Sequence, residues 1–427
     1  MRILFATRSE KTHFLSMVPL AWALRTAGHE VRVACQPELV DTVTSSGLTC
    51  VPVGSDHDFW RLLRLFPDRR ETARAGQSVP FDVVDMAPED ITWEYLRDGY
   101  ANLVPWWFRM VNDPIRDELV EYCRRWRPDA VLWEPGTYAA SVAAEAVGAV
   151  HARVTCGADL YGWVRRTYLE FMAEQPEAER VDPLADWLRR SAARHGVAFD
   201  ERLTHGHFTI EQLPPPLRID GGLEYLGLRY VPHNGRSVVD PWLWAPPERP
   251  RVCLTLGTTE AERFGDHALS VRSLVHRLAE LDAEIVATVA ETEQEALGPL
   301  PENVRVEGFV PLQALLPSCA AIVHHGGWGT VNSAVAAGVP QLLIPNDLDA
   351  PFLSRRVEEA GAGTWIAPPE ATGERVRDAV DALLSDGRYQ RGALRLREEA
   401  LTQPSPNAFV ATLEEAVRRH SAAPVGN

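Results

Sequence analysis

Short apolar runs alternate with longer helical stretches from the first residues of the chain. The apolar runs, which are rich in strand-forming side chains, cover residues 2–9, 29–35, 48–54, 128–135 and 149–154. The stretches that follow the first and fourth runs, 14–28 and 138–148, have the apolar spacing of helices. This order predicts parallel strands connected by helices in the first half of the chain, an α/β arrangement.

A second alternation begins near residue 251. Its apolar runs cover residues 251–258, 283–290, 304–310, 320–325, 340–345 and 363–368. Between the two halves, residues 213–222 and 231–250 concentrate proline, glycine and asparagine, which interrupt regular elements. The pattern therefore predicts an α/β fold of two facing Rossmann-like, doubly wound domains with an interdomain cleft.

These shifts in composition set the expected domain boundaries. We predict an N-terminal domain over 1–212, a linker over 213–250, a C-terminal domain over 251–400, and a final helix over 401–427 that packs back toward the N-terminal domain. Within the first domain, residues 93–108 gather aromatic rings. An accessory helical layer and an aromatic wall for a flat apolar ligand both fit that segment.

Composition excludes several classes of protein. The chain has 427 residues, 45% of them apolar and 24% charged, and no window approaches the roughly 18 uncharged apolar residues of a membrane span. It opens directly into a strand-like run instead of an apolar leader, so we expect a cytoplasmic location.

The net charge of −16 disfavours nucleic acid as a partner. The six cysteines are scattered, and their spacing predicts neither a zinc site nor a disulfide framework.

The stretch HHGGWGT at 324–330 follows an apolar run and precedes a helical stretch of small residues. A glycine-rich turn leading into a helix N-terminus lets backbone N–H groups approach an anion, so the stretch is typical of a phosphate site. An ordinary tight turn is the alternative. The first strand of the chain is followed by a turn that contains no glycine, which disfavours a dinucleotide-dependent oxidoreductase.

Two titratable residues lie at predicted strand ends of the first domain. His13 falls in the turn after the first strand, and Glu134 ends the fourth apolar run. A carboxylate in that place can hold the second nitrogen of a histidine and fix its tautomer, which favours a general-base pair. A structural or solvated histidine is the alternative.

Taken together, His13, LWEP (132–135), GFVPLQALLPSCAAIVHHGGWGT (308–330) and IPNDLDAP (344–351) resemble the GT-B glycosyltransferases. The resemblance is to family 1 type bacterial transferases of TDP-deoxysugars in antibiotic biosynthesis, in particular macrolide desosaminyltransferases and anthracycline aminosugar transferases. It extends over essentially the whole chain and is strongest from 304 to 352.

The resemblance implies an inverting, metal-independent transfer of a deoxysugar from a TDP-sugar to a hydroxyl of a macrolide or aromatic polyketide aglycone. The N-terminal domain would bind the acceptor, with His13 as the general base and Glu134 as its acidic partner. The C-terminal domain would bind the nucleotide sugar through Thr258, Phe309, Val310, His325, Gly326, Gly327, Thr330, Ser333 and Asp349. No cofactor and no metal are expected, and the TDP-sugar is a co-substrate.

Two departures from the family pattern concern the donor. Ser333 stands where many UDP-sugar enzymes carry a ribose-binding glutamate, which favours a deoxyribose and hence thymidine. Ala350 replaces a glutamine that often contacts the sugar, which suits a sugar that has lost hydroxyls. The tripeptide Asp347-Leu348-Asp349 could indicate a metal-dependent transferase, but its place in a doubly wound domain argues against that class.

Two other functions stay open from the sequence. One is a sugar-nucleotide epimerase on the same fold, and the other is a sugar-nucleotide binder without catalysis. The resemblance also implies a P450-like activator protein and a homodimer as possible partners.

Overall fold

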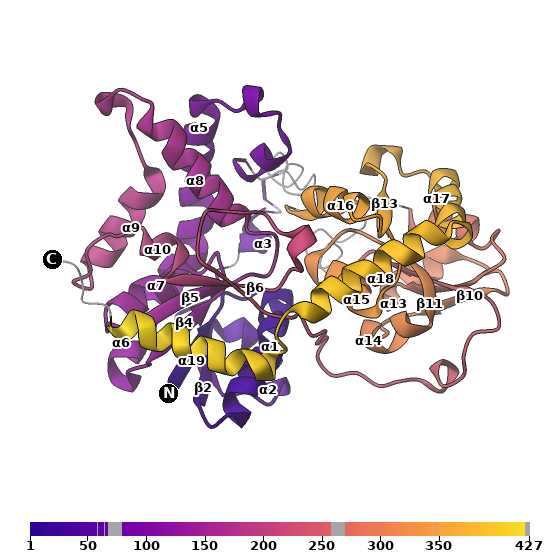
Figure 1. Ribbon diagram of the computed structural model, residues 1–427, viewed down its shortest axis with the longest axis horizontal. Coiled ribbons are helices and arrows are strands. Elements are labelled where there is room, and N and C mark those ends of the chain that lie inside the picture. The colour runs from indigo at the N-terminus through magenta and orange to yellow at the C-terminus, as the bar shows by residue number, and fades with distance from the viewer. Residues whose placement is uncertain (58, 64, 67–78, 258–269, 347, 423–427) are drawn as a thin grey trace.

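The chain forms two lobes that lie side by side, each built on one parallel sheet (Figure 1). The structure is a computed structural model that describes residues 1–57, 59–63, 65–66, 79–257, 270–346 and 348–422. None of the helices within these residues is long and apolar enough to cross a membrane.

The N-terminal sheet has the strand order β3-β2-β1-β4-β5-β6-β7. Its strands are all parallel: β1 (Arg2–Ala6), β2 (Glu30–Cys35), β3 (Cys50–Pro52), β4 (Ala130–Trp133), β5 (Val150–Val154), β6 (Phe208–Glu211) and β7 (Tyr225–Gly227). The central strands are buried on both faces because helices cover both sides, as parallel sheets require.

The C-terminal sheet has the order β10-β9-β8-β11-β12-β13 and is also parallel. Its strands are β8 (Arg251–Thr255), β9 (Glu284–Thr288), β10 (Val304–Glu307), β11 (Cys319–His324), β12 (Gln341–Leu343) and β13 (Gly363–Trp365). In both sheets the strand order reverses beside the first strand, between β1 and β4 and between β8 and β11. The predicted pair of doubly wound Rossmann-like domains is confirmed.

Helices cover both sheets. Those of the N-terminal lobe are α1 (Lys11–Thr26), α2 (Val40–Ser45), α3 (Phe59–Leu63), α5 (Trp93–Leu103), the π-helix η4 (Val104–Phe108), α6 (Arg109–Trp126), α7 (Tyr138–Glu145), α8 (Leu160–Ala173), α9 (Pro183–Ala193) and α10 (Arg202–His205). Those of the C-terminal lobe are α12 (Val271–Leu278), α13 (Glu291–Gln294), α14 (Leu312–Leu315), α15 (Trp328–Ala337), α16 (Ala350–Glu359), α17 (Gly373–Ser385) and α18 (Gly387–Thr402). Short 3-10 turns include η2 (Phe81–Asp85) and η6 (Pro215–Leu217).

The aromatic segment 93–108 is helical, and it runs through α5 and η4 into α6. Trp93, Tyr100 and Phe108 are buried in the core of the N-terminal lobe, as an accessory layer would be. Trp107 instead lies against the guanidinium of Arg8, beside the strand ends. The segment therefore packs the core and also borders the candidate site.

The last helix, α19 (Pro406–Ala422), leaves the C-terminal lobe and lies along the N-terminal lobe against α1 (Figure 1). Phe409 and Leu413 join the apolar core under β1 and β5. The chain passes between the two lobes twice, after β7 and between α18 and α19. At this place the Arg229 amide donates to the carbonyl of Pro404 at 2.9 Å, and the Gln403 side chain lies 3.3 Å from the carbonyl oxygen of Leu228. The two connections between the lobes thus run side by side.

The N-terminal sheet extends farther than the sequence analysis expects. Strand β7 pairs with β6, so the first lobe continues past residue 212, where the linker was predicted to begin. The strand has three residues and follows a segment rich in proline and glycine, so its apolar pattern is too short to recognise.

The lobes touch through α16 and α18. Both helices contact η6, and Arg355 of α16 forms an ion pair with Asp85 of η2. An apolar cluster also continues from the N-terminal lobe to Trp328 and Leu353 of the C-terminal lobe. This contact holds the carboxyl ends of the two sheets near one another.

A buried ion pair connects strands β5 and β7 of the N-terminal sheet to helix α8. Asp159, at the start of α8, accepts hydrogen bonds from both terminal nitrogens of Arg153 on β5, at 2.9 and 2.6 Å. The hydroxyl of Tyr225 on β7 donates to the same carboxylate at 2.7 Å. Both charged side chains are fully buried. One carboxylate therefore connects two strands and a helix.

Asp159→Ala should lower the free energy of unfolding by about 3–5 kcal/mol, because it leaves the Arg153 charge buried without its partner. Urea unfolding followed by circular dichroism measures the loss. The control is Asp186→Ala, which removes a half-exposed ion pair with Arg189 and should cost no more than about 1 kcal/mol. Equal losses in the two variants would contradict the structural role of the buried pair.

Candidate active site

His13 and Glu134 lie where the order of the N-terminal strands reverses. His13 is in the first turn of α1, just after β1, and Glu134 follows the last residue of β4 directly. Because β1 and β4 are neighbours, with Ala6 opposite Trp133, their carboxyl ends present the two side chains to each other. The topology alone therefore produces the pairing that the sequence analysis expects.

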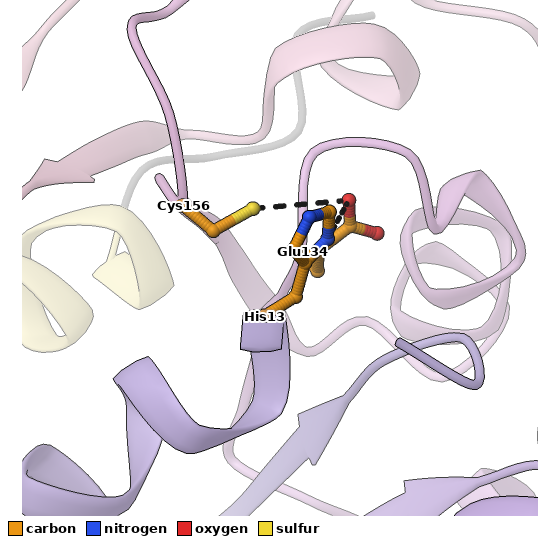
Figure 2. A group of neighbouring side chains, drawn as sticks. All are labelled: His13, Glu134 and Cys156. Atoms are coloured by element: carbon orange, nitrogen blue, oxygen red, sulfur yellow. Dashed lines mark hydrogen bonds and ion pairs between the residues drawn. The ribbon is translucent and has the colours of Figure 1, made fainter. Parts of the chain in front are cut away.

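The two side chains form a direct contact (Figure 2). His13 Nδ1 lies 3.1 Å from Glu134 Oε1, and the Thr137 hydroxyl donates to Oε2 at 2.8 Å. The imidazole is 23% exposed whereas the carboxylate is 1% exposed. A carboxylate that accepts from Nδ1–H leaves the lone pair on Nε2, which is the form that a general base needs.

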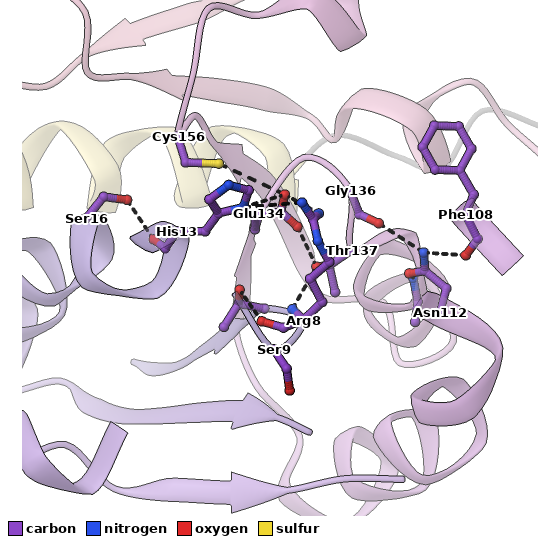
Figure 3. A network of polar contacts seen from close by, with 12 residues as sticks. Arg8, Ser9, His13, Ser16, Phe108, Asn112, Glu134, Gly136, Thr137 and Cys156 are labelled. Atoms are coloured by element: carbon purple, nitrogen blue, oxygen red, sulfur yellow. Dashed lines mark hydrogen bonds and ion pairs between the residues drawn. The ribbon is translucent and has the colours of Figure 1, made fainter. Parts of the chain in front are cut away.

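Arg8 completes this group, and the sequence analysis did not identify it. Its guanidinium forms a buried ion pair with Glu134 Oε1 (Figure 3), and its Cζ lies 5.0 Å from the centre of the Trp107 ring. The Arg8 backbone amide donates to the Thr137 hydroxyl at 3.1 Å. A Cβ at position 136 would overlap the guanidinium, so Gly136 is required for the arginine to fit. The glycine lies three residues after the end of β4, but it does not by itself indicate an arginine from another strand end.

The charges of this group determine its ionisation. Burial alone would raise the pKa of Glu134, but the Arg8 cation and the hydrogen bonds from His13 and Thr137 outweigh it and lower that pKa to about 2. Burial likewise works against the charge of Arg8, yet Glu134 raises the pKa of the guanidinium. Both groups are therefore charged at neutral pH.

Cys156, which follows β5, lies beside the pair, with its Sγ 4.0 Å from Glu134 Oε1 (Figure 2). Ligand atoms of His13, Glu134 and Cys156 lie within 4.8 Å of one another, which is close enough to share a metal ion. Burial raises the pKa of the Cys156 thiol well above its usual value, however, and Arg8 already neutralises the carboxylate. The chemistry of this set therefore favours a hydrogen-bonded network over a cation site.

The turn at 324–330 lies at the corresponding reversal point of the other sheet, between β11 and α15. His324 is fully buried, with Nε2 3.0 Å from Gln341 Oε1, and its Nδ1 accepts the Gly326 amide at 3.1 Å. Burial lowers its pKa to about 3, so the ring is neutral. The first histidine of the motif therefore shapes the turn and does not meet a ligand.

The second histidine lies between two glycine turns. A Cβ at Gly327 would overlap His325 Nε2, and a Cβ at Gly257, just after β8, would lie 2.6 Å from the ring. Gly326 and Gly257 also have positive φ values, +83° and +76°, which favour glycine. The Gly257 turn and the motif thus meet around the imidazole of His325.

Helix α15 begins at this turn without a side-chain cap at Gly327. Its first backbone N–H groups and the positive end of its dipole face the turn, which is the arrangement of an anion site. Thr330 lies in the first turn of the same helix. His325, Gly326, Gly327 and Thr330 are therefore gathered as the sequence analysis expects.

The other predicted donor residues are more dispersed. Phe309, after β10, is 51% exposed, whereas Val310 beside it is buried. Ser333 is buried in α15, and its hydroxyl donates to the carbonyl of Gly329 at 2.7 Å. Thr258 lies outside the described residues.

Asp349 connects the two lobes. It precedes α16, and its Oδ2 accepts the backbone amide of Ala158 from the N-terminal lobe at 2.7 Å. A Cβ at Gly157 would lie 2.8 Å from the same oxygen. This contact brings a carboxylate of the C-terminal lobe next to the loop that carries Cys156.

Tyr230, from the connection between the lobes, is a second residue that the sequence analysis missed. Its ring packs edge-on against Trp328 at 5.0 Å between centroids, and its hydroxyl lies 3.6 Å from the position that a Cβ would take at Gly329. It therefore covers the first turns of α15. No local pattern in the linker pointed to this contact.

Known proteins are similar to this one over nearly the whole length of the chain. The family models described as "Erythromycin biosynthesis protein CIII-like", N-terminal and C-terminal domains, match residues 22–257 and 272–416. The chain is 45% identical to the 10-deoxymethynolide desosaminyltransferase of Streptomyces venezuelae, covering 99% of each protein. It is 41% identical to the TDP-daunosamine transferase DnrS of Streptomyces peucetius, covering 99% of this chain and 98% of that protein.

A solved structure is also similar over nearly the whole chain, in fold and in sequence. The crystal structure of glycosyltransferase VinC in complex with dTDP matches with a TM-score of 0.87 and 38% identity, covering 98% of this chain and 100% of that one. Two strand-order reversals, a histidine–glutamate pair and a glycine-rich helix start thus occur in a chain whose relatives transfer sugars. The chain belongs to the erythromycin biosynthesis protein CIII-like family and is a glycosyltransferase.

Proposed function

We propose that this enzyme transfers a deoxysugar from a TDP-sugar to a hydroxyl of a polyketide aglycone, with inversion at the anomeric carbon and without a metal ion. The names of the relatives, which include macrolide and anthracycline sugar transferases, support this substrate class. One observation carries the proposal: the His13–Glu134 pair and the His325 turn lie at the reversal points of two sheets whose lobes meet at Asp349 and Ala158.

The proposed reaction is a single displacement. The acceptor oxygen forms a bond to the anomeric carbon and gives its proton to His13 Nε2, while the bond from that carbon to the diphosphate oxygen breaks. Its electron pair leaves with TDP. Glu134, which accepts from Nδ1–H, stabilises the imidazolium that results. General-base help of this kind contributes roughly 100- to 10,000-fold to the rate.

The start of α15 would receive the leaving group. The charge on the departing diphosphate would be met by backbone N–H groups after Gly327, by His325 and by the Thr330 hydroxyl. These groups supply the electrostatic stabilisation that a cation provides in other transferases. We therefore propose that the reaction needs no metal.

We further propose that the donor carries thymidine. The Ser333 hydroxyl donates to the Gly329 carbonyl, so this position of α15 presents no carboxylate to a ribose diol. A deoxyribose, which lacks the 2′-hydroxyl, suits such a surface better than a ribose. Asp349 would bind sugar hydroxyls, as the family resemblance implies. The P450-like activator and the homodimer stay expectations of the family resemblance.

The substrate class is tested by mixing the protein with a TDP-deoxysugar and a macrolide or anthracycline aglycone. Mass spectrometry should detect the glycoside and TDP, and NMR should show the inverted anomeric configuration. Excess EDTA should leave the rate unchanged, and TDP should inhibit more strongly than UDP. Loss of activity in EDTA with rescue by Mg²⁺ would contradict the metal-free mechanism, and stronger inhibition by UDP would contradict the thymidine assignment.

His13→Ala should reduce kcat by two or more orders of magnitude and leave TDP affinity nearly unchanged, because the base acts on the acceptor in the other lobe. Steady-state kinetics and calorimetric titration with TDP measure the two effects. As a control, His195→Ala removes a histidine whose partner is the half-exposed Asp117 and should retain full turnover. Near-normal turnover of His13→Ala would remove this histidine from the mechanism.

Gly327→Ala should weaken TDP binding by roughly tenfold or more, because the new Cβ displaces the His325 ring and a hydrogen bond to a charged phosphate is worth roughly 1.5–3 kcal/mol. Gly329→Ala is the matched control two residues later. There the nearest atom to a new Cβ is the Tyr230 hydroxyl at 3.6 Å, an ordinary contact, so affinity should be retained. If both variants bind TDP as the wild type does, the turn is not the phosphate site.

A further inference from the structure

Arg8 and His13 share one oxygen of Glu134. The Arg8 guanidinium pairs with Oε1, and His13 Nδ1 lies 3.1 Å from the same atom (Figure 3). The other terminal nitrogen of Arg8 lies only 3.4 Å from His13 Nδ1. The base of the proposed reaction is therefore in contact with a fixed cation as well as with a carboxylate.

We infer that Arg8 is a positioning residue whose positive charge sets the pH range in which His13 acts as a base. The inference rests on the proposed function, in which His13 removes the acceptor proton. Arg8 touches neither substrate in this account. It acts through Glu134, because its charge offsets that of the carboxylate that the imidazole faces.

The offset follows from simple electrostatics. A buried carboxylate with no other partner strongly stabilises an adjacent imidazolium, and a histidine that keeps its proton cannot accept another. With Arg8 present, the Arg8–Glu134 pair is neutral in sum. The imidazole then keeps its orientation from the hydrogen bond, and removal of the Arg8 charge would expose it to the full attraction of an unpaired carboxylate.

The surroundings hold Arg8 in this role. Its side chain is 5% exposed and lies between Trp107 and the backbone at Gly136, where no side chain would fit. Thr137 fixes the other carboxylate oxygen and accepts the Arg8 amide. The guanidinium therefore has no room to turn away from the histidine.

Few other charges face this group. Among the described residues, the titratable groups on the surrounding elements that interact with Arg8, Glu134 or Cys156 are Glu10 before α1, Cys156 after β5, Tyr161 of α8 and Asp349 before α16. Burial raises the pKa values of Cys156 and Tyr161, so both are neutral at pH 7. Glu10 and Asp349 are unaltered by a substitution at Arg8, so they do not change the comparison between variants.

The test compares the pH dependence of kcat/KM in wild type, Arg8→Gln, Arg8→Met and Arg8→Lys. The two neutral variants should move the acidic limb of the profile up by about one to two pH units, because the imidazolium gains the whole attraction of Glu134. Arg8→Lys keeps the charge and should keep the limb near the wild-type position. Above the limb, activity of the neutral variants should approach that of Arg8→Lys.

Arg8→Gln separates charge from packing, because it retains a donor for Glu134 without a charge. A limb that stays in place in Arg8→Gln and Arg8→Met, with activity lowered equally at every pH, would show that Arg8 only supports the structure and would overturn the inference. If Arg8→Met does not fold, as thermal unfolding would reveal, the comparison of Arg8→Gln with Arg8→Lys decides the question in the same way.

An NMR titration of the His13 ring resonances, assigned with His13→Ala, separates this inference from the proposed function. If the His13 titration curve is the same in Arg8→Gln as in the wild type, the role of Arg8 is overturned, while His13 can still be the base. If the NMR titration of His13 shifts in Arg8→Gln but the acidic limb of the kcat/KM profile does not, His13 is not the base. The proposed mechanism and the inference would then both be wrong. Movement of both by the same amount supports both.

Discussion

The reversal of strand order in each sheet is the constraint on which the rest of the structure depends. Beside the first strand of each lobe, successive connections leave toward opposite faces, so the loops that follow β1 and β4, and those that follow β8 and β11, diverge from one another. Side chains at those strand ends therefore lie close together. The histidine–glutamate pair lies at the reversal of strand order in the N-terminal lobe, and the glycine turn lies at the reversal in the C-terminal lobe.

The two reversal points differ in the groups that they present. In the N-terminal lobe a buried ion pair of Arg8 and Glu134 supports a half-buried imidazole, whereas in the C-terminal lobe the start of α15 faces a glycine-rich turn. The contact between Asp349 and Ala158 joins them. In the proposed mechanism, proton transfer and departure of the diphosphate take place at groups of different lobes.

Residues close in sequence to a strand end could be predicted, and residues that depend on packing could not. The positions of His13, Glu134 and the 324–330 turn follow from apolar periodicity, because each lies within a few residues of a strand. Arg8 was missed although it precedes His13 by five residues. Its role appears only when Gly136 and Trp107 enclose it, and these come from other elements. Tyr230 and the partner of Asp349 likewise depend on how the lobes meet. Of the two adjacent histidines the family resemblance singled out His325, and the structure separates the two rings by burial, since His324 is fully buried and His325 is half-buried.

The two chain crossings act as a mechanical pivot. Because the segments at Arg229 and at Gln403–Pro404 run side by side and are hydrogen-bonded, the lobes are tied along a line rather than at two separated points. A rotation of the lobes about that line would preserve these contacts, whereas sliding of one lobe past the other would break them; either movement would also separate α16 and α18 from η6. Displacements from such a rotation grow with distance from the pivot. A small change of angle there would become a larger displacement at the contact between Asp349 and Ala158, so in the proposed reaction residues remote from both substrates would govern the distance between donor and acceptor.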